Sequence, residues 1–269
     1  MHQNTFFRAI LANMLDFHLH LARLPDPREL DRQLAQCGYR YIAVACEPWE
    51  WDAVAGLEKG SREDGNSGLE GVAYGVHPMV ATETSEEQFS RLADYLRGNS
   101  RAMVGEAGLD KRFPGYEAGG AQEKVFLRQA KLALELGRDL QIHCVGDYGR
   151  IVKLLQSAGF DGHGPRPVFH RFGGDIGTVR AALPLGALFS LHADSFRKKS
   201  TAAAISLIPH ENIRFETDAD ETFMQESDRV NAQESANLAV QKSDDQAIQK
   251  CADALVKKME FVVQKFNEI

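Results

Sequence analysis

Eight short apolar runs of strand length recur along this chain, and they alternate with segments of helical pattern. Strands that alternate with helices indicate a parallel sheet, and eight such units predict a closed (β/α)8 TIM-like barrel. The runs cover residues 14–20, 39–45, 71–76, 102–106, 140–143, 168–170, 187–190 and 213–216.

Five of these runs end at or near a side chain that can bind a metal ion. The candidates are His18, His20, Glu106, His143, His170 and Asp218. In a barrel the active site lies at the carboxyl ends of the strands, so we expect these side chains to meet around a divalent metal centre. An open doubly wound sheet is the alternative, but it would spread the five strands along a line. Only a closed barrel brings them together.

Helix signals between the runs support the alternation. The segment PDPRELDRQLAQCG has Asp26 at a favoured N-cap position, Pro27 in the first turn and Gly38 after the end. A second segment, QEKVFLRQAKLALELG, ends at Gly137, where glycine commonly terminates a helix. We therefore expect a helix to follow each strand.

The pattern changes after Asp218. Residues 221–245 are polar, and we interpret them as a loop and helix over the barrel. The segment DQAIQKCADALVKKMEFVVQKF then repeats apolar residues at helical spacing, which predicts a C-terminal closing helix. We expect a single hydrolase domain at residues 14–269, preceded by an N-terminal extension at residues 1–13.

Composition limits the classes of function. The 269 residues carry 31 basic and 38 acidic side chains, a net charge of -7, so bulk charge does not indicate a nucleic-acid binder. A polyanion would have to be held by metal or by small basic clusters. No run approaches the roughly 18 apolar residues of a membrane span. The four cysteines form no CxxC pair, which predicts reduced thiols and a cytoplasmic protein. We expect no membrane association, and no obligate protein partner is evident from the sequence.

The spacing of His18 and His20 favours ligation, because side chains two apart on a strand share a face. Asp16 shares that face, and we expect it to orient a ligand histidine, with a fixed structural hydrogen bond as the alternative. Glu106 follows Gly105 at the end of a buried-looking run, where an ionised carboxylate is costly unless it is paired or bound to a cation.

The remaining candidates have plainer alternatives. His143 and His170 could each be core histidines with satisfied hydrogen bonds. Asp218 could cap a helix after Thr217, since aspartate is a favoured cap residue. At the end of the eighth strand it could instead bind metal and accept a proton from an attacking water.

Further polar residues follow the strands and should surround the mouth of the barrel. His77 is either a substrate contact or a hydrogen-bonding residue at a strand end. His192 and Asp194 lie in a loop that could contribute to the site. The basic residues Lys111, Arg171, Arg197, Lys198 and Lys199 could contact phosphate, and ordinary solvated charge is the alternative.

Six short motifs resemble the TatD family of metal-dependent hydrolases and deoxyribonucleases, which have amidohydrolase-like barrels. They are DFHLH at 16–20, GVHP at 75–78, GEAGLD at 105–110, HC at 143–144, HRFGG from 170 and ETDA at 216–219, in the family's order. The resemblance implies two divalent ions. Glu106 would bridge them, with His18, His20 and Asp218 on one and His143 and His170 on the other. The ligand types by themselves leave open one ion or two, and Mg, Mn and Zn are the candidates.

The chain departs from this family where substrate would lie. Val145 replaces the family's usual arginine, Arg171 replaces the cysteine of HCF, and Asp220 replaces the proline after ETDA. The leading hypothesis is a deoxyribonuclease or phosphodiesterase acting on DNA or a small phosphoester, with Asp218 and Glu106 as catalytic residues. The alternatives are an amide, ester or lactone hydrolase and, third, a non-catalytic metal-stabilised binding protein.

Overall fold

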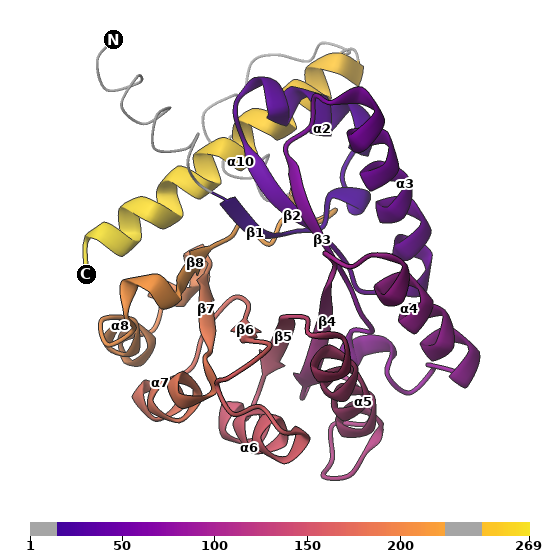
Figure 1. Ribbon diagram of the computed structural model, residues 1–269. Coiled ribbons are helices and arrows are strands. Elements are labelled where there is room, and N and C mark those ends of the chain that lie inside the picture. The colour runs from indigo at the N-terminus through magenta and orange to yellow at the C-terminus, as the bar shows by residue number, and fades with distance from the viewer. Residues whose placement is uncertain (1–14, 224–243) are drawn as a thin grey trace.

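Eight parallel strands form a closed barrel in the computed structural model, which describes residues 15–223 and 244–269 (Figure 1). Each strand pairs with its neighbours in sequence, and β1 pairs with β8. The strands are β1 (Leu15–Leu19), β2 (Arg40–Ala45), β3 (Leu69–Tyr74), β4 (Met103–Asp110), β5 (Leu140–Val145), β6 (Pro167–Phe169), β7 (Leu188–Leu191) and β8 (Ile213–Phe215). The predicted barrel is confirmed, and the open sheet is excluded.

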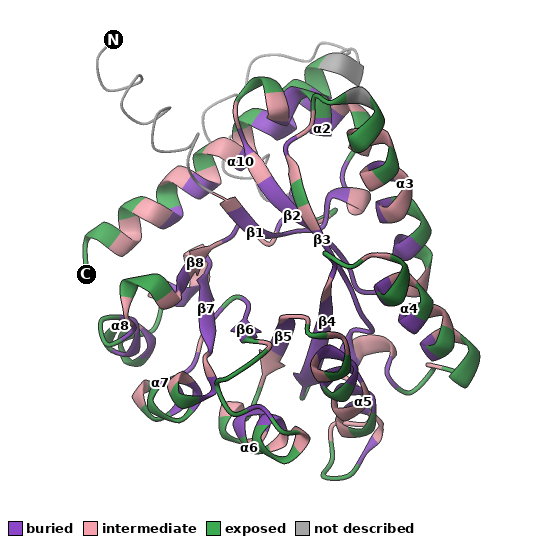
Figure 2. Cartoon of the chain, in the orientation of Figure 1, coloured by how far each residue is buried: buried purple, intermediate pink, exposed green. Residues whose placement is uncertain are grey.

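Helices surround the barrel and bury their inner faces against it (Figure 2). They are α2 (Pro27–Gln36), α3 (Pro48–Asp64), α4 (Glu86–Gly98), α5 (Ala121–Leu136), α6 (Tyr148–Ala158), α7 (Ile176–Ala182), α8 (Lys199–Ile205) and α10 (Asp244–Asn267). The predicted ends hold, because the Asp26 side chain accepts a hydrogen bond from Glu29 N at 3.2 Å and Gly137 caps α5 in the left-handed conformation. Among the described residues, no helix is long and apolar enough to cross a membrane.

The C-terminal helix α10 packs beside α2, as the closing-helix prediction requires (Figure 1). Its buried side chains repeat at helical spacing: Ile248, Ala252, Leu255, Met259 and Val262. The proposed extension at residues 1–13 lies outside the described residues. So does most of the polar segment 221–245 that we expected as a loop and helix.

One strand boundary differs from the prediction in a way that shapes the site. β4 continues four residues beyond the predicted run and ends at Asp110, because Ala107 pairs with Ile142 after a register shift. Such a bulge re-aims the side chains beside it. Gly105 lies there at φ 128°, and a Cβ on it would come within 2.5 Å of the Gln141 carbonyl oxygen. Only glycine lets Glu106 reach its position so close to β5.

The first and last strands are joined by a buried carboxylate. Asp16 accepts hydrogen bonds from Tyr39 Oη at 2.7 Å, Thr217 Oγ1 at 2.6 Å and Thr217 N at 3.0 Å. It also accepts one from the backbone N–H of His18 at 3.2 Å. Asp16 therefore links β1 to the residue before β2 and to the segment after β8. It contacts His18 through the backbone N–H of that residue.

Candidate metal centre

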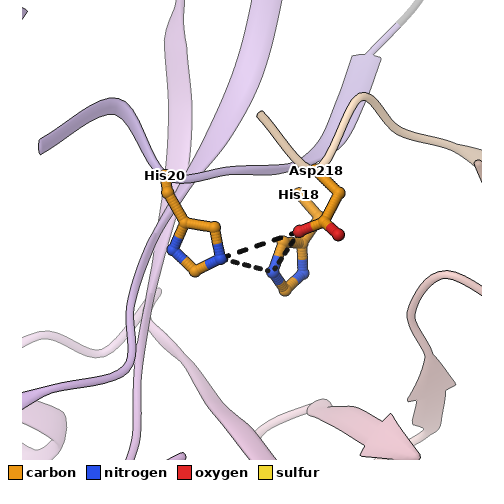
Figure 3. A group of neighbouring side chains, drawn as sticks. All are labelled: His18, His20 and Asp218. Atoms are coloured by element: carbon orange, nitrogen blue, oxygen red, sulfur yellow. Dashed lines mark hydrogen bonds and ion pairs between the residues drawn. The ribbon is translucent and has the colours of Figure 1, made fainter. Parts of the chain in front are cut away.

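Two histidines of β1 and its end form the first part of the site. The Nε2 atoms of His18 and His20 lie 3.3 Å apart, and Asp218 Oδ1 lies 3.9 and 3.7 Å from them (Figure 3). Glu106 Oε2 lies 3.5 Å from His18 Nε2 and 3.7 Å from His20 Nε2. Four side chains from β1, β4 and the end of β8 thus direct donor atoms at one another.

The second oxygen of Glu106 faces a different set of histidines. Its Oε1 lies 2.5 Å from His143 Nδ1, 2.7 Å from His170 Nε2 and 3.8 Å from His77 Nε2. His143 Nδ1 is itself 3.3 Å from both His170 Nε2 and His77 Nε2. The structure brings all six predicted ligands into one buried cluster, with Glu106 between its two halves and His77 beside the second.

The donor atoms suit a divalent cation. Imidazole nitrogen and carboxylate oxygen are common ligands of divalent cations in proteins. Gln141 Oε1 lies 2.5 Å from His18 Nδ1, and because it can only accept, it places the ring proton on Nδ1. In the neutral ring, the lone pair of His18 Nε2 then points toward His20 Nε2. A bound cation would satisfy this lone pair. A hydrogen bond would satisfy it only if His20 Nε2 carries a proton. Four groups among the described residues have the spacing of ligand sets: His18–His20–Asp218, His18–Glu106–His170, His20–Cys46–Glu106 and His77–Glu106–His143. All their members are buried except Asp218, which is partly buried.

Three polar side chains that we did not predict hold these histidines in place. Gln141 contacts His18, Asp110 Oδ2 lies 2.9 Å from His143 Nε2, and Glu216 Oε1 lies 3.4 Å from His170 Nδ1. Such outer contacts fix the tautomer and orientation of a ligand. Sequence offered partial signals, since Gln141 stands two residues before His143, and Glu216 two before Asp218. Strand periodicity places each such pair on one face.

Burial and charge shift the pKa values in opposite directions across the cluster. Burial lowers the pKa of His77 to about 3 and also lowers the pKa of His20. Burial acts the same way on His143 and His170, but nearby carboxylates outweigh it and raise their pKa values. Glu106 acts on both histidines, Asp110 adds to its effect at His143, and Glu216 adds to it at His170. Those histidines in turn hold the pKa of Glu106 well below its usual range, against the effect of burial. Without a cation, His143 and His170 therefore hold a proton more tightly than a free imidazole does.

Asp218 is shared between the histidines and an arginine. Its Oδ1 faces His18 and His20, while its Oδ2 accepts a hydrogen bond from Arg171 Nη1 at 2.7 Å. Burial opposes ionisation, but the histidines and Arg171 lower the pKa of Asp218 far below its usual value. Arg171 Nη2 also donates to Asp194 Oδ2 at 2.5 Å. Asp218 is consequently an ionised carboxylate with both oxygens engaged.

A cleft of about 840 Å³ opens beside His143 and His170, between the loops that follow β5, β6 and β7. Four of the predicted basic residues line it: Lys111, Arg171, Arg197 and Lys198. Lys199 begins α8 and lies outside the lining. Arg197 Nε donates to Asp194 Oδ1 at 2.9 Å, and His192 Nδ1 accepts from Asp194 N at 3.1 Å. Asp194 thus accepts hydrogen bonds from both Arg171 and Arg197, and its backbone N–H donates to His192.

His77 stands at the edge of the cluster rather than in the cleft lining. Its Nδ1 accepts a hydrogen bond from Met79 N at 3.0 Å, and its Nε2 faces Glu106 and His143. The ring therefore makes the strand-end hydrogen bond that we considered and also directs a nitrogen at the candidate centre.

Comparison with known proteins identifies a family that this chain matches. The family model described as TatD related DNase matches residues 15–243. A 3'-5' ssDNA/RNA exonuclease TatD of Edwardsiella piscicida is 31% identical over 148 residues, 54% of this chain and 56% of that protein. The human deoxyribonuclease TATDN3 is 25% identical over 227 residues, which cover 79% of this chain and 80% of that protein.

Solved structures agree in fold. The TatD homologue YJJV of Escherichia coli superposes with a TM-score of 0.68 at 19% identity, over 96% of this chain and 99% of the other. A TatD family hydrolase of Entamoeba histolytica gives a TM-score of 0.66 at 14% identity, over 94% and 95% of the two chains. Against the bacterial exonucleases the matched region spans little more than half their length, 56% and 55% in two cases.

Proposed function

Since this chain belongs to the TatD-related DNase family, we propose that it is a divalent-metal-dependent phosphodiesterase that hydrolyses DNA or a small phosphoester. The observation that carries the proposal is the position of Glu106. One of its oxygens faces His18 and His20, the other faces His143 and His170, and a basic cleft begins at the second pair. Phosphate would therefore reach the cluster along a path lined with positive charge.

In this proposal the six clustered side chains hold the cofactor. His18, His20 and Asp218 would bind one divalent ion, His143 and His170 a second, and Glu106 would contribute to both. Four imidazoles with two carboxylates favour Zn or Mn over Mg. When bound, such ions lower the pKa of water toward neutrality and offset negative charge on phosphate oxygens.

The chain's own residues then supply position and proton transfer. Asp218 is ionised, so it can orient a water molecule and accept its proton, provided that Oδ2 is released by Arg171. Arg171, Arg197, Lys111 and Lys198 would hold substrate phosphates in the cleft, and Arg171 is the one that touches both cleft and centre. Asp110, Gln141 and Glu216 would keep the ligand histidines oriented.

We further propose that residues 14–269 act as one hydrolase domain and that the protein is cytoplasmic. The free cysteines support the second point, since Cys37, Cys46, Cys144 and Cys251 form no disulfide.

The test is hydrolysis by protein whose metal content has been measured by mass spectrometry. Single-stranded DNA, a generic phosphodiester and a panel of amides, esters and lactones would be compared. We expect cleavage of the phosphodiesters and none of the carbonyl substrates. The reverse preference would favour the amide, ester or lactone hydrolase. Binding of metal without any hydrolysis would favour the non-catalytic protein.

A charge variant separates DNA from a small phosphoester. Replacing Lys111, Arg197 and Lys198 by alanine should raise the KM for single-stranded DNA and leave a small phosphodiester unaffected. The dependence of DNA binding on salt should also weaken, by about 0.7 in the log–log slope for each lost phosphate contact. A matched variant at Lys131, Lys153 and Arg180, on the outer helices α5, α6 and α7, changes net charge equally and should leave both substrates unaffected.

A further inference from the structure

A large aromatic side chain is exposed near the mouth of the barrel. Trp49 is 54% exposed, whereas Trp51 is fully buried and donates its Nε1–H to the Gly75 carbonyl at 3.0 Å. Trp49 is the second residue of α3, which begins directly after the carboxyl end of β2. It therefore lies at the end of the barrel that carries the candidate centre. Helix α3 packs through Trp51, so core packing does not account for Trp49.

A fixed arginine supports the ring of Trp49. The Arg23 guanidinium carbon lies 5.7 Å from the centre of the Trp49 ring, within the range of a cation–π contact. Arg23 is held by Glu50, to which its Nε donates at 2.7 Å, and by Glu47, to which its Nη2 donates at 2.6 Å. Its side chain is only 12% exposed. The ring is thus supported by a preordered cation while much of its surface faces solvent.

This platform connects directly to the candidate centre. Glu50 is fully buried, and its Oε1 lies 3.9 Å from His20 Nδ1. Arg23 Nη2 also lies 3.6 Å from the Sγ of Cys46, which neighbours His20 and Glu106. Trp49 therefore stands beside the β1 and β2 end of the cluster. The basic cleft stands across the barrel mouth, at the loops after β5, β6 and β7 (Figure 1).

Charge distinguishes the two sides of the mouth. Arg23 is surrounded by three carboxylates: Glu47 at 2.6 Å, Glu50 at 2.7 Å and Glu221 at 3.7 Å. One guanidinium cannot offset three acids, so a phosphate beside Trp49 would be repelled. An uncharged planar ring would not be repelled, and stacking on an aromatic side chain is a common way of binding an unpaired base.

We propose that Trp49 is a stacking platform for the terminal nucleobase of a single strand whose phosphates run from the cluster into the basic cleft. The inference rests on the proposed function and deepens it. Among the described residues, the carboxylates of Glu47, Glu50 and Glu221 disfavour a further phosphate beyond that base, so the platform suits a strand end. Trp49 binds and positions the substrate, and the reacting phosphate lies at the cluster.

Fluorescence tests binding without turnover. Chelator-treated protein does not cleave its substrate under the proposed function, so oligonucleotides can be titrated at equilibrium. Trp49 is exposed and Trp51 is buried, so quenching by acrylamide reports mainly on Trp49. An intact oligonucleotide should protect Trp49 from acrylamide, and one that is abasic at the bound end should not. Oligonucleotides abasic at the 3' or at the 5' end identify which end is bound. Equal protection by all three oligonucleotides overturns the proposal.

Kinetics provide the second test. Trp49→Ala should raise the KM for single-stranded DNA about 5- to 150-fold, the range expected for one stacked base, with little change in kcat. Trp49→Phe should retain most of the affinity. An oligonucleotide with an abasic terminus should be cleaved equally by the parent and by Trp49→Ala, because neither can stack it. Equal thermal midpoints of the two proteins show that the substitution leaves the fold intact.

The outcomes separate this proposal from the proposed function. If the parent cleaves DNA and Trp49→Ala has the same KM, the platform is refuted and the phosphodiesterase stands. If no phosphodiester is cleaved but the intact strand still protects Trp49, the phosphodiesterase is refuted and the nucleobase site stands.

Discussion

Replacing Gln141 by leucine should weaken metal binding, although it changes none of the predicted metal ligands. Gln141 is fully buried on β5, and its Oε1 lies 2.5 Å from His18 Nδ1. Its Nε2 donates to the Phe17 carbonyl at 3.1 Å. Leucine fills similar space but leaves the His18 ring proton and the Phe17 oxygen without these partners. His18 then loses the contact that holds its ring proton on Nδ1 and directs Nε2 at the cluster.

The size of both effects follows from these contacts. Leaving one buried polar group unsatisfied costs about 1–3 kcal/mol, so the two groups together should lower the free energy of unfolding by about 2–6 kcal/mol. Losing a contact that orients a metal ligand typically lowers metal affinity about 10- to 100-fold. That range corresponds to about 1.4–2.7 kcal/mol of binding free energy.

Gln129→Leu is the matched control. Gln129 is also fully buried, and its amide makes two hydrogen bonds with the backbone of Val76, at 2.8 and 3.0 Å. The same substitution there should cost similar stability and leave metal affinity within about twofold, since Gln129 holds no predicted ligand. Affinity would be measured by competition with a chromogenic chelator, and stability by urea unfolding of chelator-treated protein. Parent-like affinity in Gln141→Leu, or an equal loss in Gln129→Leu, would refute the reasoning.

Three further predictions address the centre and the barrel. Asp218→Asn should lower turnover about 100-fold or more while the protein stays folded. Steady-state kinetics would measure the turnover and circular dichroism the fold. His163→Ala, in an exposed loop, is the control and should match the parent. A divalent ion at 100 times its Kd should raise the free energy of unfolding by about 2.7 kcal/mol over chelator-treated protein, and an unchanged thermal midpoint would count against a built site. Burial raises the pKa of Asp16 from 3.8 to about 6, so the folded state binds this proton more tightly than the unfolded chain. Ionisation of Asp16 should therefore lower the free energy of unfolding by about 3 kcal/mol. This loss of stability is fully present above about pH 6 and absent below about pH 4. Asp16→Asn should remove that part of the pH dependence in unfolding titrations of metal-free protein.

The repeating strand and helix pattern was enough to predict the barrel. The residues that meet at its mouth were predicted from their positions at the ends of apolar runs together with the family resemblance. Histidine and carboxylate at the ends of apolar runs are rare enough to stand out. Gln141 and Asp110 were missed because their roles depend on the ring orientations of residues on other strands. The extension of β4 was missed because it depends on pairing with β5, which lies far along the chain.

The surface was harder to predict than the core. Lys199 was grouped with Arg197 and Lys198 by sequence proximity, yet the start of α8 carries it out of the cleft lining. Trp49 and Trp51 differ by two residues, and nothing local to the sequence says which one faces solvent. The helical turn and the position of α3 against β2 and β3 decide it.

The first half of the cluster lies across the line where the two ends of the sheet meet. His18 and His20 belong to the first strand and its end, and Asp218 follows the last. Backbone bonds continue the joint, from Asp218 N to His18 O and from His20 N to Ala219 O, each 3.0 Å. The proposed ion would therefore hold the first and last strands of the barrel together. During synthesis it would have no complete site until residue 218 had emerged and β8 had docked, so acquisition of metal would be a late event in folding. Opening this joint would dismantle the site, and release of the ion would report that the barrel had come apart.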